Sequence, residues 1–244
     1  MSPGDPPVIT TIGEIVRGDA AVFPPYLYEA YRSTIRRAPR LPLVDVPLTA
    51  SELITPRHDT AFVAPEDADL TRNAGTGGEA LGQRIIVTGR VIDENGVPVD
   101  GALLEVWQAN AAGRYVHHVD QHPAPLDPNF TGAGRCLTDD DGRYRFVSIK
   151  PGPYPWKNHD KAWRPAHIHF SLFGNVYAQR LVTQMYFPND PLFPYDPIFN
   201  SIPDQAARER LVSRFSLEHT VGDAMLGYEF DIVLRGRGAT PFGL

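Results

Sequence analysis

Cysteine is nearly absent from this sequence, with Cys136 alone in 244 residues. A single cysteine excludes a disulfide within the chain and any metal site built from several thiolates, and it fits a reducing compartment. No run approaches the roughly 18 apolar residues that a membrane-spanning helix needs. The first residues, Met1-Ser-Pro-Gly-Asp-Pro-Pro7, lack the basic start and the apolar run of a signal peptide. We therefore expect a cytoplasmic protein with no membrane partner.

Basic residues are also too few for a nucleic-acid binder. Lys and Arg number 23 against 29 Asp and Glu, which gives a net charge of −6. Nucleic-acid recognition needs a clustered excess of positive charge. The one arginine cluster, between Arg32 and Arg40, is short and is interrupted by Pro39. We expect no nucleic-acid partner.

Helical periodicity is scarce, whereas turn-forming residues are abundant, with 24 Pro and 21 Gly. Residues 1–82 contain one short helical pattern, Pro25–Ala38, with Leu27, Tyr31 and Ile35 on one face. The remainder of that stretch has no sustained period. We expect residues 1–82 to be an irregular N-terminal arm that packs on the core or on a partner chain.

From residue 83 onward the composition changes to short runs rich in β-branched and aromatic residues. Asp93–Gly96 and Asp139–Gly142 are predicted as turns, the second as a hairpin turn, and residues 203–215 as a helix. Strands separated by turns, with little helix, predict an all-β protein with a β-sandwich core. We expect residues 83–244 to be the sandwich catalytic domain of what is overall a single structural domain. The expected strands are 84–92, 102–108, 143–148, 166–172, 180–187 and 228–235.

Two histidines lie two residues apart in the predicted strand 166–172. Strand side chains alternate between faces, so His167 and His169 point the same way while Ile168 points to the other face. Two strand residues rise about 6.5 Å, and imidazole–metal bonds are about 2 Å long. The two rings can therefore share one metal ion, although the pair alone is equally compatible with a coincidence of core or surface packing.

Phenols are the remaining candidates to complete such a site, because the sequence has no cysteine cluster and few carboxylates lie nearby. Tyr154 lies on a Pro-rich loop, and Tyr115 follows the end of a predicted strand. A phenol with a pKa near 10 binds as an anion only to a strong Lewis acid. Fe(III) fits phenolate and imidazole ligands, whereas Zn(II) more often takes carboxylate, thiolate or a third histidine.

Five spaced motifs together resemble the intradiol ring-cleavage dioxygenases, over a stretch from about Tyr31 to Arg235. Within that family they are most similar to iron-bearing β chains that pair with a homologous α chain. Those enzymes use O₂ to cleave protocatechuate (3,4-dihydroxybenzoate) to 3-carboxy-cis,cis-muconate in aromatic catabolism. The motifs are Glu105-Val-Trp-Gln-Ala-Asn110, Gly113-Arg-Tyr115, Leu126-Asp-Pro-Asn-Phe130, Pro151-Gly-Pro-Tyr-Pro-Trp156 and Trp163-Arg-Pro-Ala-His-Ile-His169.

The resemblance implies roles for particular residues. One non-haem Fe(III) per chain would be held by Tyr115, Tyr154, His167 and His169. Tyr154 would also accept a substrate proton by leaving the iron, and Arg164 would stabilise carbanion character on the ring. Gln184 would lie beside the O₂ and substrate pocket. The implied substrate-binding residues are Tyr31, Trp156, Arg164 and Gln184.

Residue by residue, other interpretations stay open from the sequence alone. Arg164 could form a surface ion pair, Gln184 could be exposed on its strand, and Tyr31 could belong to a helix face. His117, His118 and His122 could form a second metal site with Asp120, but we favour a solvated loop because adjacent strand histidines point apart and prolines interrupt the run.

At the level of the whole chain, the substrate could instead be catechol, chlorocatechol or hydroxyquinol. Relatives that use those substrates carry a helical N-terminal domain that residues 1–82 do not resemble. The run 89–106 also resembles transthyretin-like binding modules, which need no metal; that alternative leaves the histidine and tyrosine pattern without a purpose.

Overall fold

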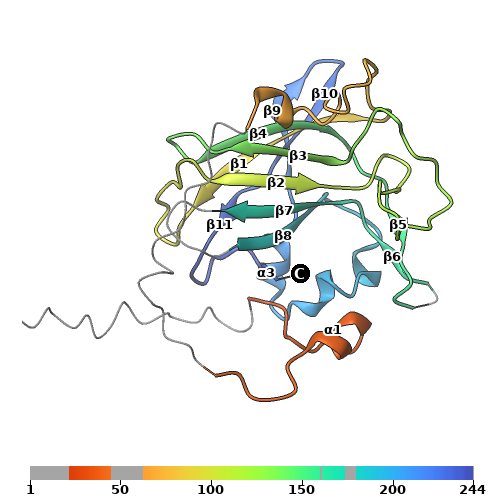
Figure 1. The fold of residues 1–244 in the computed structure, drawn as a ribbon. Helices are drawn as coiled ribbons and strands as arrows, with labels where there is room; N and C mark the ends of the chain where they lie inside the picture. The colour runs from red at the N-terminus through yellow and green to blue at the C-terminus, as the bar shows by residue number, and fades with distance from the viewer. Residues whose placement is uncertain (1–21, 45–62, 160, 174–179, 244) are drawn as a thin grey trace, which may run out of the picture.

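The chain folds into two stacked β-sheets with a small two-stranded ribbon at one end (Figure 1). The computed structural model describes residues 22–44, 63–159, 161–173 and 180–243. Within this part of the chain nearly all regular structure is strand, so the predicted all-β class is confirmed.

The first sheet is built around β1 (Arg84–Ile92), a long strand with partners on both sides. It pairs antiparallel with β4 (Arg143–Ile149) and parallel with β10 (Met225–Glu229) and β11 (Ile232–Val233). The edge strand β9 (Arg214–Val221) pairs with β10.

The second sheet carries the predicted histidine strand in its interior. Its order is β3 (Ala133–Leu137), β2 (Leu103–Trp107), β7 (His167–Phe173) and β8 (Arg180–Tyr186), all antiparallel. The separate ribbon of β5 (Tyr154–Pro155) and β6 (Trp163–Arg164) lies beyond the end of this sheet (Figure 1).

Period-two alternation places the apolar core between the two sheets. Val87 and Phe146 of the first sheet and Leu104, Ile168 and Phe170 of the second are all fully buried in one cluster. Burying such side chains contributes roughly 1.5–3 kcal/mol each. Residues of opposite parity on β2 and β7 therefore face away from this core.

Both predicted helices exist but are shorter than expected. α1 is Arg32–Arg37, and α3 is Gln205–Glu209, with Asp204 capping Ala206 N–H. The chain beyond α3 leaves the helix because Leu211 O and Ser213 N pair with the backbone of Tyr186 at the end of β8. It then enters β9, a strand that the sequence did not predict. Three 3₁₀ turns complete the elements of the described residues: η2 (Pro65–Ala68), η3 (Phe193–Tyr195) and η4 (Phe199–Ser201).

Two further expectations were wrong in detail. The predicted strand 228–235 breaks at Phe230, whose N–H bonds to Thr88 O and whose carbonyl passes so close to Gly89 that a Cβ there would overlap it. The turn Asp139–Gly142 is no hairpin, because it joins β3 to β4 in the other sheet. β3 was missed because its short sequence, Ala-Gly-Arg-Cys-Leu, lacks alternation.

Residues just before β1 pack closely on the first sheet. Leu70 is fully buried, and its N–H donates to Val147 O on β4. Much of the predicted arm, residues 1–21 and 45–62, lies outside the described residues. The division of the chain at residue 82 therefore stays a prediction. No helix in the described part is long and apolar enough to cross a membrane.

The buried state of Cys136 on β3 gives a test of this fold. Burial raises the pKa of its thiol to about 12, so at pH 8 only about one thiol in 10⁴ is ionised, and the thiolate is the reactive form. We expect iodoacetamide to leave Cys136 unmodified in the native protein and to alkylate it fully in guanidinium chloride. Rapid labelling of the native protein, followed by mass spectrometry, would contradict this packing.

Candidate metal centre

β7 presents its two histidines side by side on the face away from the core. Their ring centroids are 4.8 Å apart, and Ile168 between them is fully buried on the opposite face. The neighbouring strands supply the surroundings in register: Trp107 and Gln184 lie opposite His169. Trp107 stacks on His169 with the rings parallel and 4.8 Å apart. This stacking restricts the orientation of one of the two imidazoles.

Tyr154 reaches the histidines from the β5–β6 ribbon. Pairing of these strands sets Tyr154 opposite Arg164. The Tyr154 hydroxyl lies 3.4 Å from His167 Nε2, with ring centroids 5.5 Å apart. The rigid sheet thus holds the imidazoles, while a short ribbon carries this phenol.

Tyr115 completes the group from the loop after β2. Its ring meets that of Tyr154 edge-on at 5.3 Å and lies 6.4 Å from the ring of His169. Two phenols and two imidazoles from three separate segments thus converge. These are the four side chains that the family resemblance implied.

Glycine makes the approach of the two tyrosine loops possible. Gly113 has a φ of +78°, and a Cβ on it would overlap the carbonyl oxygen of Pro153. Gly113 and Gly152 both donate their N–H to Asn110 O at 2.9 Å. The loops that carry Tyr115 and Tyr154 are therefore tied together at backbone contact distance.

Asp120 fixes the other side of the Tyr115 loop. Its Oδ2 accepts the N–H of Tyr115 at 2.8 Å, and its Oδ1 accepts the N–H of His122 at 2.8 Å. The Arg114 guanidinium lies 4.0 Å from the same carboxylate. The sequence had no pattern that would identify this role for Asp120.

Both histidines are neutral in this environment. Burial, reinforced by the nearby charge of Arg164, lowers the pKa of His169 to about 3 and holds the pKa of His167 well below its usual range. His167 Nδ1 donates to Pro165 O at 2.7 Å, which leaves Nε2 unprotonated. That nitrogen accepts from Arg164 Nη1 at 2.9 Å. Nε2 has one lone pair, so a metal ion bound to His167 would replace the hydrogen bond from Arg164.

The hydroxyl of Tyr115 is buried and has no hydrogen-bond partner among the residues that the structure describes. Burial, together with the adjacent Tyr154, raises its pKa well above the ordinary value. An orphaned buried hydroxyl is unfavourable by about 1–3 kcal/mol. A metal ion bound there would remove this deficit, and only a strongly charged one would displace the proton.

Arg164 is buried beside the four side chains instead of forming the surface ion pair that the sequence left open. Burial is the largest single effect and lowers the pKa of the guanidinium, but Asp196, Tyr186 and Tyr154 together raise it well above the ordinary value. Nη2 donates to Gln184 Oε1 at 2.5 Å, which places Gln184 in the same buried network. Gln184 is therefore not the exposed strand residue of the alternative interpretation.

Tyr31 and Trp156 also lie at this end of the sheet. Their rings meet edge-on at 5.4 Å, and the Arg164 guanidinium lies 5.8 Å from the Trp156 ring. Asn158 holds the start of α1 in place, because its side chain accepts Arg32 N–H at 2.9 Å and donates to Ala30 O at 2.6 Å. All eight predicted site residues are thus gathered in one region.

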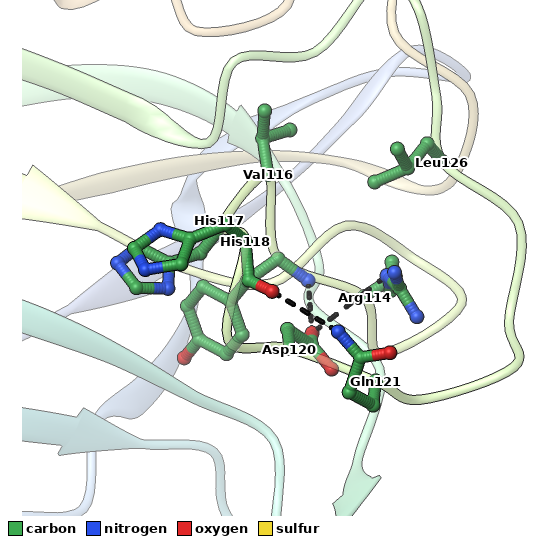
Figure 2. A pocket seen from close by; sticks show the side chains of 8 residues that line it. Arg114, Val116, His117, His118, Asp120, Gln121 and Leu126 are labelled. Atoms are coloured by element: carbon green, nitrogen blue, oxygen red, sulfur yellow. Dashed lines mark hydrogen bonds and ion pairs between the residues drawn. The ribbon is translucent and has the colours of Figure 1, made fainter.

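An open pocket of about 350 Å³ borders Tyr115 but none of the predicted substrate contacts (Figure 2). His117 and His118 lie on one side of it, their rings stacked at 4.5 Å, with Arg114 and Gln121 on the other side. His122 turns instead toward the edge of Trp163. The rings of His117 and His118 therefore do not point apart, contrary to the expectation. Among the described residues, however, these histidines and Asp120 do not bring three ligand atoms together, which favours a loop without a metal over a second metal site.

One further group of potential ligands lies on the β9–β10 hairpin. Glu218, His219 and Glu229 bring one ligand atom each within 4.8 Å of one another. Arg214 and His219 already pair with the Glu229 carboxylate. The hairpin is exposed, and this group is adequately explained as surface ion pairing.

Comparison with known proteins agrees with this geometry. The family model described as "Dioxygenase" matches residues 54–236. The model described as "Protocatechuate 3,4-dioxygenase beta subunit N terminal" matches residues 16–49. The chain belongs to the intradiol ring-cleavage dioxygenase family. A protocatechuate 3,4-dioxygenase beta chain from Burkholderia cepacia is 62% identical over 218 residues, which cover 89% of this chain and 92% of that relative.

More distant relatives include an alpha chain and an enzyme that acts on a different catechol. A protocatechuate 3,4-dioxygenase alpha chain from Pseudomonas putida is 32% identical, covering 67% of this chain and 77% of its own length. The solved 3-chlorocatechol 1,2-dioxygenase of Rhodococcus opacus 1CP has the same fold, with a TM-score of 0.54 at 24% identity over 71% of this chain and 66% of that one.

Gly113 allows a direct test of the tyrosine convergence. Gly113→Ala should lower the free energy of unfolding by about 1–2 kcal/mol for the positive φ and by about 1–3 kcal/mol more for the clash with Pro153. We also expect it to weaken ferric iron binding, because the two loops must separate. Both effects are measurable by thermal unfolding and by iron titration.

Gly77 is a matched control for that substitution, since it has the same φ of +78° and no atom lies within 4 Å of the position that a Cβ would take. Gly77→Ala should show the backbone strain alone and bind iron normally. Equal effects of the two substitutions would contradict the close approach of the tyrosine loops.

Proposed function

We propose that this chain is the iron-bearing beta subunit of a protocatechuate 3,4-dioxygenase. The observation that carries the proposal is the convergence of Tyr115, Tyr154, His167 and His169 in a chain 62% identical to such a beta chain. The reaction breaks the ring bond between the two hydroxylated carbons and adds one atom of O₂ to each of them. Protocatechuate thereby becomes 3-carboxy-cis,cis-muconate.

The donor set fits a single ferric ion. Two phenolates and two neutral imidazoles reduce a charge of +3 to +1, which one hydroxide would balance. The unpaired Tyr115 hydroxyl and the neutral histidines support this choice. Iron bound there would act as a Lewis acid that withdraws electron density from a catecholate and so activates its ring toward O₂.

The chain's own residues would then manage protons and charge. Tyr154, on its short ribbon, would accept one of the two protons that a catechol loses on binding. The buried guanidinium of Arg164 would stabilise negative charge that develops on the ring, and it is already oriented before substrate arrives. Tyr31 and Trp156 would form the aromatic wall of the substrate site.

A partner subunit fits the apolar surface near α1. Leu27 and Ile35, which the sequence predicted to share a helix face, are 52% and 56% exposed in the isolated chain. A homologous alpha chain covering this surface would bury them. The proposed working enzyme is therefore an alpha/beta hetero-oligomer.

Oxygen uptake tests the function. The chain co-purified with its alpha partner and loaded with ferric iron should consume one O₂ per protocatechuate and release the carboxymuconate. Catechol and hydroxyquinol should be turned over at least about tenfold more slowly, since neither carries the carboxylate. Faster turnover of hydroxyquinol would favour the alternative substrate, whose 1,2-dioxygenase from a Rhizobium species is 36% identical over 50% of this chain.

Tyr154→Phe distinguishes the role of Tyr154 from that of Tyr115. We expect it to retain most of the iron, because Tyr115, His167 and His169 remain, but to alter the tyrosinate-to-iron colour and slow substrate binding. His167→Ala, by contrast, should lose iron. Visible spectra and iron analysis of both variants measure this, and full iron with full activity in His167→Ala would show the ligand assignment to be wrong.

A further inference from the structure

Asp196 is a fully buried carboxylate that no motif in the sequence identified. It lies between η3 and η4, and its side chain is 0% exposed. Its Oδ2 accepts from Arg164 Nη2 at 3.0 Å and from the Tyr186 hydroxyl at 3.0 Å. A carboxylate so placed compensates a buried guanidinium that would otherwise be strongly unfavourable.

The surrounding loop holds Asp196 rigidly. Its Oδ1 accepts the N–H of Ile198 at 3.0 Å, and its carbonyl accepts both the backbone N–H of Asn200 at 3.0 Å and the Asn200 side chain at 2.8 Å. Every polar atom of the carboxylate therefore has a partner. Asp196 is a fixed point against which a neighbouring side chain can be oriented.

The guanidinium of Arg164 is anchored through one nitrogen. Nη2 donates to Gln184, Tyr186 and Asp196, whereas Nη1 faces His167 Nε2 at 2.9 Å and the Tyr154 hydroxyl at 3.4 Å. Nε is buried without a hydrogen-bond partner. The cluster around Nη2 thus sets the orientation of the group even though Nε is left unsatisfied.

We infer that Asp196 is a positioning residue that acts through Arg164. Its charge holds Nη2, and this keeps Nη1 turned toward Tyr154 and His167, where the reacting ring would lie. Gln184 and Tyr186 are neutral, so they contribute hydrogen bonds but no compensating charge. The inference rests on the proposed function of Arg164 and predicts that Asp196 affects the chemical step more than substrate binding.

Asp196→Asn tests the role of the charge, because the amide oxygen keeps the shape and one acceptor. In the iron-loaded alpha/beta complex we expect kcat for protocatechuate to fall about 10- to 100-fold, in the range typical of outer-shell partners. KM should change less than about threefold, and iron content and resting colour should stay those of the unsubstituted enzyme. A wild-type kcat, or loss of iron, would overturn the inference.

A double-mutant cycle with Arg164→Met shows whether Asp196 acts through Arg164. In the Arg164→Met background, Asp196→Asn should lower kcat no further. In the metal-free protein, Asp196→Asn should lower Tm, and Arg164→Met/Asp196→Asn should recover it, because the unpaired buried charge is gone. Equal losses of kcat in both backgrounds would mean that Asp196 acts independently of Arg164.

Two more variants complete the design. Asp190→Asn is the matched control, since Asp190 accepts the N–H of Ala166 at 3.1 Å beside β7 but has Leu192 as its other partner; its kcat should stay near that of the unsubstituted enzyme. Tyr186→Phe removes one hydrogen bond to Asp196 while keeping the charge of the carboxylate, so its loss of kcat should be smaller. If Asp196→Asn alone does not fold, Tyr186→Phe replaces it as the test.

An unsubstituted complex without activity would count against the proposed function. An active complex whose kcat does not change on Asp196→Asn would count against this inference alone.

Discussion

Alternation along β7 is the constraint on which the candidate site depends. Ile168 and Phe170 must enter the core between the sheets, so His167 and His169 must point away from it. Because β7 is an interior strand, both its neighbours contribute in register: Trp107 stacks on one histidine, and Gln184 and Tyr186 lie opposite the pair. The energy that fixes the imidazoles is thus the burial of ordinary apolar side chains on the other face.

The phenols reach this rigid platform by a different route. Tyr115 and Tyr154 come from loops that meet through Gly113 and Gly152, where side chains would prevent contact. Burial keeps both histidines neutral, and the buried positive charge of Arg164, paired across the ribbon from Tyr154, reinforces this effect. The sheet, the glycine contact and the buried charge together give a cluster of two neutral imidazoles and two phenols, and only a strong Lewis acid would displace the phenol protons.

The structural features that depend on local sequence pattern were predictable from the sequence. β1 has the predicted bounds because nine residues rich in Val and Ile carry one unbroken signal, and the orientation of the histidine pair follows from period two. The helix predicted at 203–215 was longer than the observed one, because backbone hydrogen bonds of Leu211 and Ser213 with Tyr186 end the helix early, and the sequence pattern does not show this tertiary interaction. Asp196 escaped notice for a related reason: it is a lone acidic residue in a loop, and its partner Arg164 lies 32 residues earlier in the sequence. Asp120 was considered only with the neighbouring histidines, because no pattern indicated its hydrogen bond to the Tyr115 N–H.

The position of bound iron is the most direct test of the candidate site. Crystals of the ferric-loaded complex, measured at the iron absorption edge, would locate the ion without reference to activity. We predict one anomalous peak for each copy of this chain, enclosed by Tyr115, Tyr154, His167 and His169. A peak on the Glu218–His219–Glu229 hairpin instead, or no ordered iron among the four side chains, would contradict it.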